Sequence, residues 1–423
     1  MSSPLVSYIC RNCAANISRF AQTRSASTLA KRPPAKFSSF FLHNNVWAHQ
    51  PNNATPLASR PTPQTVRGNV VAATSPSLPA YREAEVLTAR RLLKIYAQLS
   101  KSRLTVLVVL TAMSGVALSP LPTSVPVLLA TAIGTALCSA SANTLNQLQE
   151  VPFDAQMART RNRPLVRHAV SPLHATGFAI VTGISGPAIL WAMVNPTTAF
   201  LGAANIALYS GLYTWLKRKS ILNTWVGAVV GAIPPLMGWA ACGGHLLPSA
   251  AHPVVVFLPS FLTSVPMDVS LMDNPLAPFA LFMFLFSWQF PHFNSLSHFV
   301  RDSYAQAGYK MLCVISPSKN ALVSLRYALL FLPICSILVP LSGLTTWTFA
   351  LTSLVPNLIC IEAAWKFWKK GGEKEARRVF QHSLWFMPVV LGLMMFHKRG
   401  MDWGSWFGLG EAEKAKEEHG DSA

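Results

Sequence analysis

Apolar residues gather into long stretches along the chain from about residue 104 onward. A helix needs about 20 mostly apolar residues to cross a bilayer. Nine stretches close to that length predict spanning helices, near 104–121, 125–147, 173–193, 197–216, 223–242, 276–296, 323–342, 346–368 and 380–397. The pattern therefore predicts an all-α fold, a multi-pass transmembrane helical bundle of about nine spans.

Two further stretches favour the membrane surface. Residues 84–102 combine Leu92 and Leu99 with Arg90 and Lys94 at helical spacing, which predicts a basic amphipathic helix beside the first span. Residues 253–262 are apolar but too short to span, and they stand in the long loop before the sixth span. We expect them to form an interfacial or re-entrant segment without a catalytic duty.

The connections between the predicted spans alternate in charge. Loops after the second, fourth, sixth and eighth spans contain Lys and Arg, and loops after the first, third, fifth and seventh contain neither. Basic loops face the compartment of synthesis or import. With an odd number of spans, the polar C-terminal tail is expected on the opposite side.

The first 80 residues differ in composition from the rest of the chain. They contain eight Lys and Arg residues, many Ser, Thr, Ala and Pro, and no Asp or Glu. Such a composition is typical of a mitochondrial transit peptide. We predict a transit peptide and disordered linker at 1–80, a transmembrane domain at 81–400 and a polar tail at 401–423. The bundle is then expected in the mitochondrial inner membrane, with its basic loops in the matrix.

Overall composition argues against a soluble protein and against a nucleic-acid-binding protein. Hydrophobic residues make up 51% of the chain and charged residues 12%, whereas soluble domains contain about 25% charged residues. The net charge of +19 lies in the leader and in particular loops, so we expect no nucleic-acid partner. Cys10 and Cys13 form a C-x-x-C pair in the predicted leader, and no second pair completes a metal or disulfide framework.

Residues 143–172 carry the clearest chemical pattern. Asn146, Glu150 and Asp154 recur every four residues and share one face of a helix, although a kink at Pro152 would make the alignment of Asp154 approximate. Carboxylate oxygens followed by arginines suit a magnesium diphosphate. The alternative is an interfacial anchor that sets topology. The arginines that follow are Arg159, Arg161, Arg163 and Arg167.

Two later places add polar residues at the ends of even-numbered spans. Lys217, Arg218 and Asn223 follow the fourth span, just before Gly227 and Gly231, which have the G-x-x-x-G spacing of closely packed membrane helices. At the end of the sixth span the polar residues are His292, Asn294, His298, Asp302 and Lys310. A histidine there is more often a hydrogen-bonded polar group than a ligand, and the motif around His292 distinguishes it from His298.

These residues resemble the motifs of the UbiA-type intramembrane prenyltransferases. The second motif of that family, roughly Trp-x-x-Pro-His-Phe and then Asp-x-Tyr-x-x-Ala-Gly, matches residues 288–293 and 302–308. The resemblance covers residues 99–398. The first motif, with Glu150 where many members have Asp, matches Asn146, Glu150, Asp154, Met157, Arg159, Thr160, Arg163, Pro164 and Leu165.

Within that family the resemblance is to the members that modify heme. It implies transfer of farnesyl from farnesyl diphosphate to a vinyl group of heme b, with addition of water, giving heme O and diphosphate. This reaction is a step of heme A biosynthesis for cytochrome c oxidase assembly. The resemblance also implies Mg²⁺ as the cofactor and a polar site at the matrix-side mouth of the bundle.

The resemblance assigns roles to ten residues. The expected catalytic and magnesium-binding residues are Asn146, Glu150, Asp154 and Asp302. The expected substrate-binding residues are Arg159, Arg163, Lys217, Arg218, Asn223 and His292. The apolar interior of the bundle would hold the isoprenoid chain.

Two rival functions remain open at this point. A prenyltransferase for a quinone precursor such as 4-hydroxybenzoate would need a pocket for an aromatic acid. A non-enzymatic membrane carrier or assembly factor would be expected to show internal repeats, and none is evident. Heme A synthase and a second copy of the chain are the candidate protein partners, and no residue pattern selects either.

Overall fold

The computed structural model describes residues 88–259, 262 and 273–401. The predicted transit peptide and linker at 1–80 lie outside these ranges. So does the predicted tail at 401–423, apart from Met401. The predicted surface segment at 253–262 is described except for residues 260 and 261.

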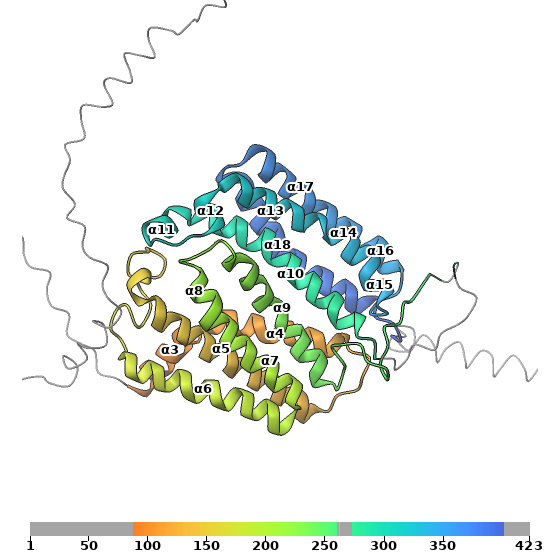
Figure 1. Cartoon of the computed structure of the whole chain (residues 1–423), viewed down its shortest axis with the longest axis horizontal. Helices are drawn as coiled ribbons and strands as arrows, with labels where there is room; N and C mark the ends of the chain where they lie inside the picture. Colours follow the sequence, from red (N-terminus) through yellow and green to blue (C-terminus); the bar gives the residue numbers. More distant parts are fainter. Residues whose placement is uncertain (1–87, 260–261, 263–272, 402–423) are drawn as a thin grey trace, which may run out of the picture. The chain divides into compact units, whose positions relative to one another are not determined.

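Helices form the fold, and the described residues contain no strand beyond one isolated bridge between Thr345 and Lys398. Figure 1 shows the longer helices running side by side. In chain order the elements are α3 (Ala89–Leu99), α4 (Ser102–Leu118), α5 (Val125–Asp154), α6 (Pro172–Met193), α7 (Pro196–Ile206), η2 (Ala207–Tyr213), α8 (Thr214–Leu216), α9 (Asn223–Ala241), α10 (Leu276–Phe299), α11 (Arg301–Gln306), α12 (Leu312–Ile315), α13 (Pro317–Leu329), α14 (Phe331–Pro333), η3 (Ile334–Leu338), α15 (Val339–Leu341), α16 (Thr348–Thr352), α17 (Leu354–Lys370) and α18 (Gly372–Phe396).

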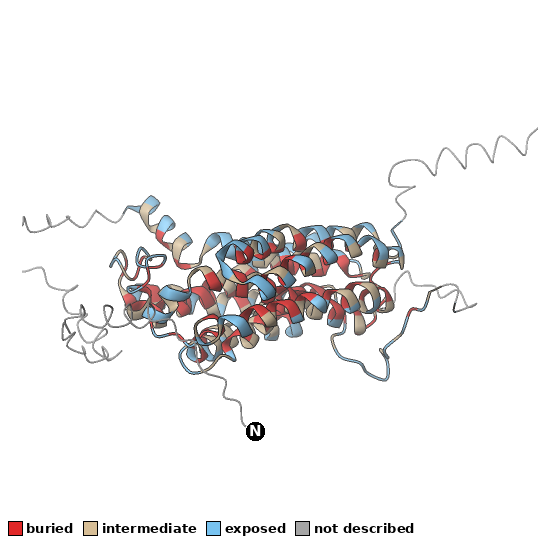
Figure 2. Cartoon of the chain, turned by 90° about the horizontal axis from the view of Figure 1, so that it is seen from above, coloured by how far each residue is buried: buried red, intermediate tan, exposed pale blue. Residues whose placement is uncertain are grey.

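The helices have the length and composition of membrane spans. Seven stretches of the described chain can cross a bilayer, and the bent pair α3–α4 makes an eighth. The continuous run α7–η2–α8, 196–216, coincides with the remaining predicted segment. Large apolar side chains such as Ile184, Trp191 and Phe200 are exposed, and Figure 2 shows exposed residues along the outer sides of the bundle, as expected where lipid replaces water. The predicted all-α membrane bundle is confirmed.

The bundle core is built mainly from the C-terminal helices. α10 packs on α9, α13 and α18, and α17 packs on α18. The rings of Phe284, Phe331 and Phe386 meet at the centre of this cluster, with Phe331 and Phe386 4.5 Å apart. α9 provides the main contact between this half and the helices that precede it.

The predicted amphipathic helix exists as α3 and is separated from α4 by a break. Lys101 occupies the left-handed backbone region, with φ of 50°, and the two helices meet at an angle of 57°. Ile95 and Leu99 are buried against the bundle. α3 therefore packs on the bundle, in contact with α4 and α5, at the point where polar residues gather.

Glycines set the distance between helices α4 and α9. A Cβ on Gly238 would collide with the carbonyl oxygen of Ala112, and one on Gly115 would collide with that of Pro235. Gly227 and Gly231, predicted as the packing pair, instead lie against side chains of other elements, Tyr213 and Gln289. Backbone contact therefore occurs at Gly115 and Gly238, which the G-x-x-x-G spacing did not indicate.

The described part of the segment 253–262 is extended and closes one end of the bundle. The backbone N–H of Phe257 donates to Leu341 O at 2.9 Å, and Trp347 Nε1 donates to Phe257 O at 3.2 Å. Asn274 Nδ2 donates to Val255 O at 2.7 Å. These bonds join the segment to the ends of α15 and α16, far along the helices from the polar motifs.

Candidate active site

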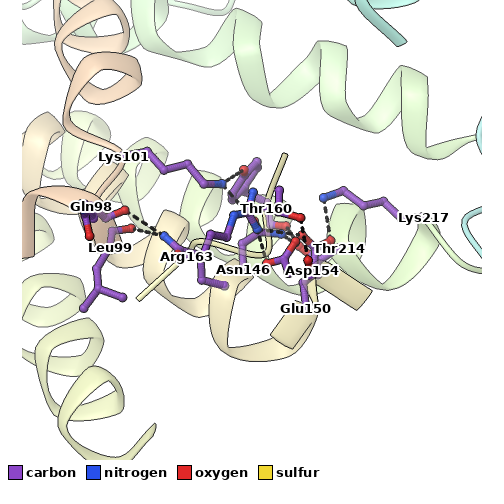
Figure 3. A network of polar contacts seen from close by, with 12 residues as sticks. Gln98, Leu99, Lys101, Asn146, Glu150, Asp154, Thr160, Arg163, Thr214 and Lys217 are labelled. Carbon is purple, nitrogen blue, oxygen red and sulfur yellow. Dashed lines mark hydrogen bonds and ion pairs between the residues drawn. The ribbon is translucent and has the colours of Figure 1, made fainter. Parts of the chain in front are cut away.

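The acidic residues of the first motif lie at the end of α5, which continues through Pro152 to Asp154. Asn146, Glu150 and Asp154 are 1%, 4% and 1% exposed. An i, i+4, i+8 spacing stacks them along one side of the helix. Figure 3 shows the three side chains among basic groups that come from other segments.

Each acidic group has a basic partner. Glu150 Oε1 accepts a hydrogen bond from Lys217 Nζ at 2.7 Å, and Glu150 Oε2 lies 3.8 Å from Arg163 Nη1. Arg163 also forms an ion pair with Asp154. Burial opposes the charge on Lys217, but the adjacent Glu150 carboxylate outweighs it and raises the pKa of Lys217 above the ordinary lysine value. The cluster is thus a compact set of opposite charges away from bulk water.

Lys101 is a member of this cluster that the sequence did not indicate. Its Nζ donates to Asn146 Oδ1 at 3.0 Å and to the Tyr209 hydroxyl at 3.3 Å. The amide nitrogen of Asn146 donates in turn to Thr214 Oγ1 at 3.0 Å. The break between α3 and α4 is what turns the lysine inward, and no spacing in the sequence reveals that break.

The sequence also did not predict the π-helix η2. It places Tyr209 near Lys101 and Tyr213 under the Lys217 ammonium, which lies 4.6 Å from the ring centroid. Gln149 Nε2 satisfies the carbonyl of Ser210 within the widened turn, at 2.8 Å. Wide turns of this kind are frequent at functional sites.

The second motif reaches the cluster through its backbone and tyrosines. Lys310 N donates to Lys217 O at 2.8 Å. Tyr309 is buried, its ring lies 5.7 Å from that of Phe153, and its hydroxyl lies near the Glu150 carboxylate. Burial and the neighbouring charges of Glu150 and Asp154 raise the pKa of Tyr309, so this phenol keeps its proton and can act as a donor.

Several predicted site residues lie outside the cluster. Asp302 is 86% exposed and pairs with Arg301 Nε at 3.4 Å. Asn223 is fully buried, but its amide nitrogen donates to the carbonyls of Ser220 and Lys310 at 2.6 and 3.1 Å. Arg159 is exposed. Arg218 is also exposed, and its guanidinium lies 4.9 Å from the Phe153 ring. The structure does not bring these four side chains into direct contact with Glu150 or Asp154.

An apolar cavity of about 380 Å³ adjoins the cluster. Tyr209 and Tyr213 line it on the cluster side, and His292 lines it from α10. The His292 ring stacks on Trp288 with centroids 4.5 Å apart, and its Nδ1 lies 3.0 Å from Ser383 Oγ. The volume is near the lower end of ligand pockets, which hold roughly 300–1,000 Å³, and suits a flexible hydrocarbon chain.

The oxygen donors fit a divalent cation of the magnesium type. One amide oxygen and two carboxylates occur at successive turns of α5, and such hard oxygen atoms are the ligands that Mg²⁺ prefers. Asp154 Oδ1 is buried and has no hydrogen-bond partner within the described ranges, so an acceptor is available in the cluster.

Fold and site together define an intramembrane helical protein with a buried acidic and basic cluster beside an apolar cavity. The model of the UbiA prenyltransferase family matches residues 108–386. The chain belongs to that family.

Two relatives are similar to this chain over most of its length. The chain is 48% identical over 337 residues to the mitochondrial protoheme IX farnesyltransferase of Yarrowia lipolytica, covering 76% of this chain and 65% of that protein. It is 44% identical over 305 residues to the human protein of the same name, covering 72% and 62%. The chain thus spans slightly less than two thirds of the length of these two relatives.

Solved structures support the fold. Digeranylgeranylglyceryl phosphate synthase matches with a TM-score of 0.54 and 14% identity, covering 72% of this chain and 98% of that chain. A UbiA homologue from Aeropyrum pernix matches with a TM-score of 0.51 and 16% identity, covering 70% and 97%. At these identities the similarity concerns the arrangement of helices.

Proposed function

We propose that this protein transfers the farnesyl group of farnesyl diphosphate to a vinyl group of heme b, giving heme O and diphosphate. Water supplies the hydroxyl group of the product. The observation that carries the proposal is the buried Glu150–Asp154–Arg163–Lys217 cluster beside an apolar cavity. Its relatives named protoheme IX farnesyltransferase support heme b as the acceptor.

The cluster can bind a diphosphate and assist its departure. Asn146, Glu150 and Asp154 would hold Mg²⁺, which supplies positive charge to the diphosphate oxygens when bound. Arg163 and Lys217 are positioned to exchange their carboxylate partners for phosphate oxygens. Negative charge grows on the diphosphate as the carbon–oxygen bond breaks, and fixed basic groups stabilise it. Lys101 would position Asn146 through their 3.0 Å hydrogen bond.

Four predicted site residues have side chains outside the cluster, and we propose a role for each. Arg159 and Arg218 are exposed at the same end of the bundle, and we assign them to the capture of the incoming diphosphate. Asp302 would join the site when the substrate is present. Asn223 is assigned a positioning role, because its amide holds the 310 backbone beside the cluster.

The cavity would shield the reactive carbon after cleavage. Its apolar walls exclude water from the allylic cation until the vinyl carbon attacks. His292 lines the cavity, and we assign it to contact with the porphyrin, either as an iron ligand or as a polar neighbour.

We infer a location from the same pattern of residues. The proposed placement is the mitochondrial inner membrane with the cluster facing the matrix. It is supported by the acid-free leader, by the alternation of basic loops and by the word mitochondrial in the relatives' names. The proposed domains remain a leader and linker at 1–80, the membrane domain at 81–400 and a tail at 401–423.

The test uses purified protein in detergent with heme b, farnesyl diphosphate and Mg²⁺. Chromatography and mass spectrometry should show heme O, and omission of Mg²⁺ should abolish it. Asp154→Asn should lower the rate by about 10²–10³-fold, the effect expected when one stabilising group of a developing charge is removed. The variant should retain the thermal unfolding midpoint of the parent within a few degrees.

Two other outcomes would change the assignment. Prenylation of 4-hydroxybenzoate in place of heme b would keep the chemistry and move the acceptor. No transfer to either acceptor by folded protein would favour the carrier or assembly function. Unchanged heme O synthesis by Asp154→Asn would remove the catalytic role of the first motif.

A further inference from the structure

A second group of ligand-type side chains lies in the α9–α10 connection, residues 242–275. His245, His252 and Asp273 each offer one ligand atom, and these atoms lie within 4.8 Å of one another. His245 is near the end of α9, and Asp273 is three residues before α10 begins. The group therefore links the two ends of the α9–α10 connection. This connection contains none of the residues of the acidic and basic cluster at the end of α5.

Asp273 is the unusual member of this group. Its side chain is only 9% exposed, and its Oδ1 atom is buried without a hydrogen-bond partner among the described residues. Its Oδ2 atom accepts from both the backbone N–H and the Nδ1 of His245, each at 2.7 Å. A largely buried carboxylate is costly unless a positive charge compensates it.

The α9–α10 connection itself provides no permanent positive charge for this carboxylate. Residues 242–275 contain no Lys or Arg. Lys398 and Arg399 line a small pocket with the adjacent Asn274, but they donate to the backbone carbonyls of Ala117, Ser119 and Thr345. In the described part of the chain, the ion-pair partner of Asp273 is His245. The His245 and His252 rings stack with centroids 3.6 Å apart, and each ring has a nitrogen within 4.8 Å of the Asp273 carboxylate oxygen. One ion could therefore reach both imidazoles and the buried carboxylate.

We propose that His245, His252 and Asp273 bind one divalent transition-metal ion, for which Zn²⁺ is the best fit. Imidazole nitrogen and carboxylate oxygen are both ordinary zinc ligands. His245 Nδ1 and Asp273 Oδ2 lie 2.7 Å apart, closer than two ligands of one tetrahedral zinc ion, which lie about 3.3 Å apart. A small outward movement of the exposed His245 ring would let the metal take the place of the proton between them. The partly buried His252 supplies the third ligand, and water completes the site.

This site does not depend on the proposed farnesyl transfer. The metal would link the beginning and end of the α9–α10 connection. Asn274 Nδ2 donates to Val255 O and Ser342 O in the same region. The expected consequence is a more stable closure of this end of the bundle. The metal would have a structural role, and the acidic cluster at the end of α5 would be unaffected.

The experiment uses the full chain in detergent, purified without a histidine tag and stripped with a chelator. Zn²⁺ is then added, unbound metal is removed, and zinc per chain is measured by elemental analysis. We expect one Zn²⁺ per chain and a higher thermal midpoint, because an ion that binds only the folded state stabilises it. His252→Ala should lower zinc affinity at least about tenfold and remove most of the thermal shift.

The choice of variants separates ligation from folding. The side chain of His252 contacts His245 by stacking, so its loss is expected to leave the fold intact. The matched control is His174→Ala, whose ring bonds Tyr96 on α3; this variant should bind zinc as the parent does. No retained zinc in the parent, or equal zinc and equal thermal shift in His252→Ala and the parent, would overturn the proposal.

Discussion

The two acidic motifs of this protein follow apolar helices and differ in what happens at the helix end. The first motif stays helical from Asn146 to Asp154, so Glu150 and Asp154 remain in the packed bundle and pair with Lys217 and Arg163. The second motif leaves α10 at Phe299 and enters the six-residue α11, where Asp302 is 86% exposed. Continuation of the helix decides whether a carboxylate is preorganised or free to move.

The difference in burial indicates separate roles for the two motifs. Buried, paired carboxylates are fixed before substrate arrives, which favours stabilisation of charge without reorganisation. An exposed carboxylate on a short helix can approach only when the loop moves, as in many sites that close over their substrate. We therefore assign the first motif to the resting site and Asp302 to the substrate-bound state.

The largest effect is expected from Glu150→Gln. This change removes the partner of the buried Lys217 and one proposed magnesium ligand, so the rate of heme O formation should fall by about 10²–10³-fold. Glu362→Gln is the matched control, because Glu362 is 63% exposed in α17 and pairs with Lys366. Exposed pairs contribute little, and the control should stay close to the parent rate. Similar losses in both variants would show that the effect is not specific to the cluster.

A smaller effect is expected from Asp302→Asn. If Asp302 joins the site only with substrate, the variant should lose about tenfold to a hundredfold in kcat/KM, with unchanged stability in the absence of substrate. Steady-state kinetics against farnesyl diphosphate and Mg²⁺, with thermal unfolding of the free protein, measure the two quantities. A kcat/KM equal to that of the parent would show that Asp302 takes no part in the reaction and that the first motif forms the site without it.

The smallest effect is expected from Lys101, which supports the first motif through Asn146. Lys101→Met should lower kcat about tenfold, because the amide oxygen of Asn146 loses its 3.0 Å donor. Lys101→Gly should lower kcat similarly but should unfold at a higher temperature than Lys101→Met. The reason is that glycine adopts the positive φ of this position without strain. Equal kcat for the parent and both variants would remove the positioning role.

Zinc binding at the other end of the bundle provides a further contrast. The His245–His252–Asp273 group should respond to metal removal by a change in thermal midpoint, whereas the first motif should respond to Glu150→Gln by a change in rate. Measuring both properties on both sets of variants tests whether the two ends act independently, as expected for sites far apart that share no partners.

Much of the fold was determined by the sequence itself. Each predicted spanning segment coincides with helical structure, because a chain in lipid must satisfy its backbone bonds within helices. The i, i+4, i+8 spacing already placed Asn146, Glu150 and Asp154 on one face, and α5 contains all three. Local periodicity and hydrophobicity are sufficient for such features, since both depend on neighbours along the chain.

The tertiary structure decided the rest of the site. Lys101 enters the cluster because a left-handed residue breaks α3 from α4, and Tyr209 enters because η2 widens a helical turn. Asp302 stays outside although its motif is intact, and Asp273 meets His245 across 28 residues of chain. These contacts depend on helix breaks and on packing between distant segments, for which the order of residues alone provides no periodic signal.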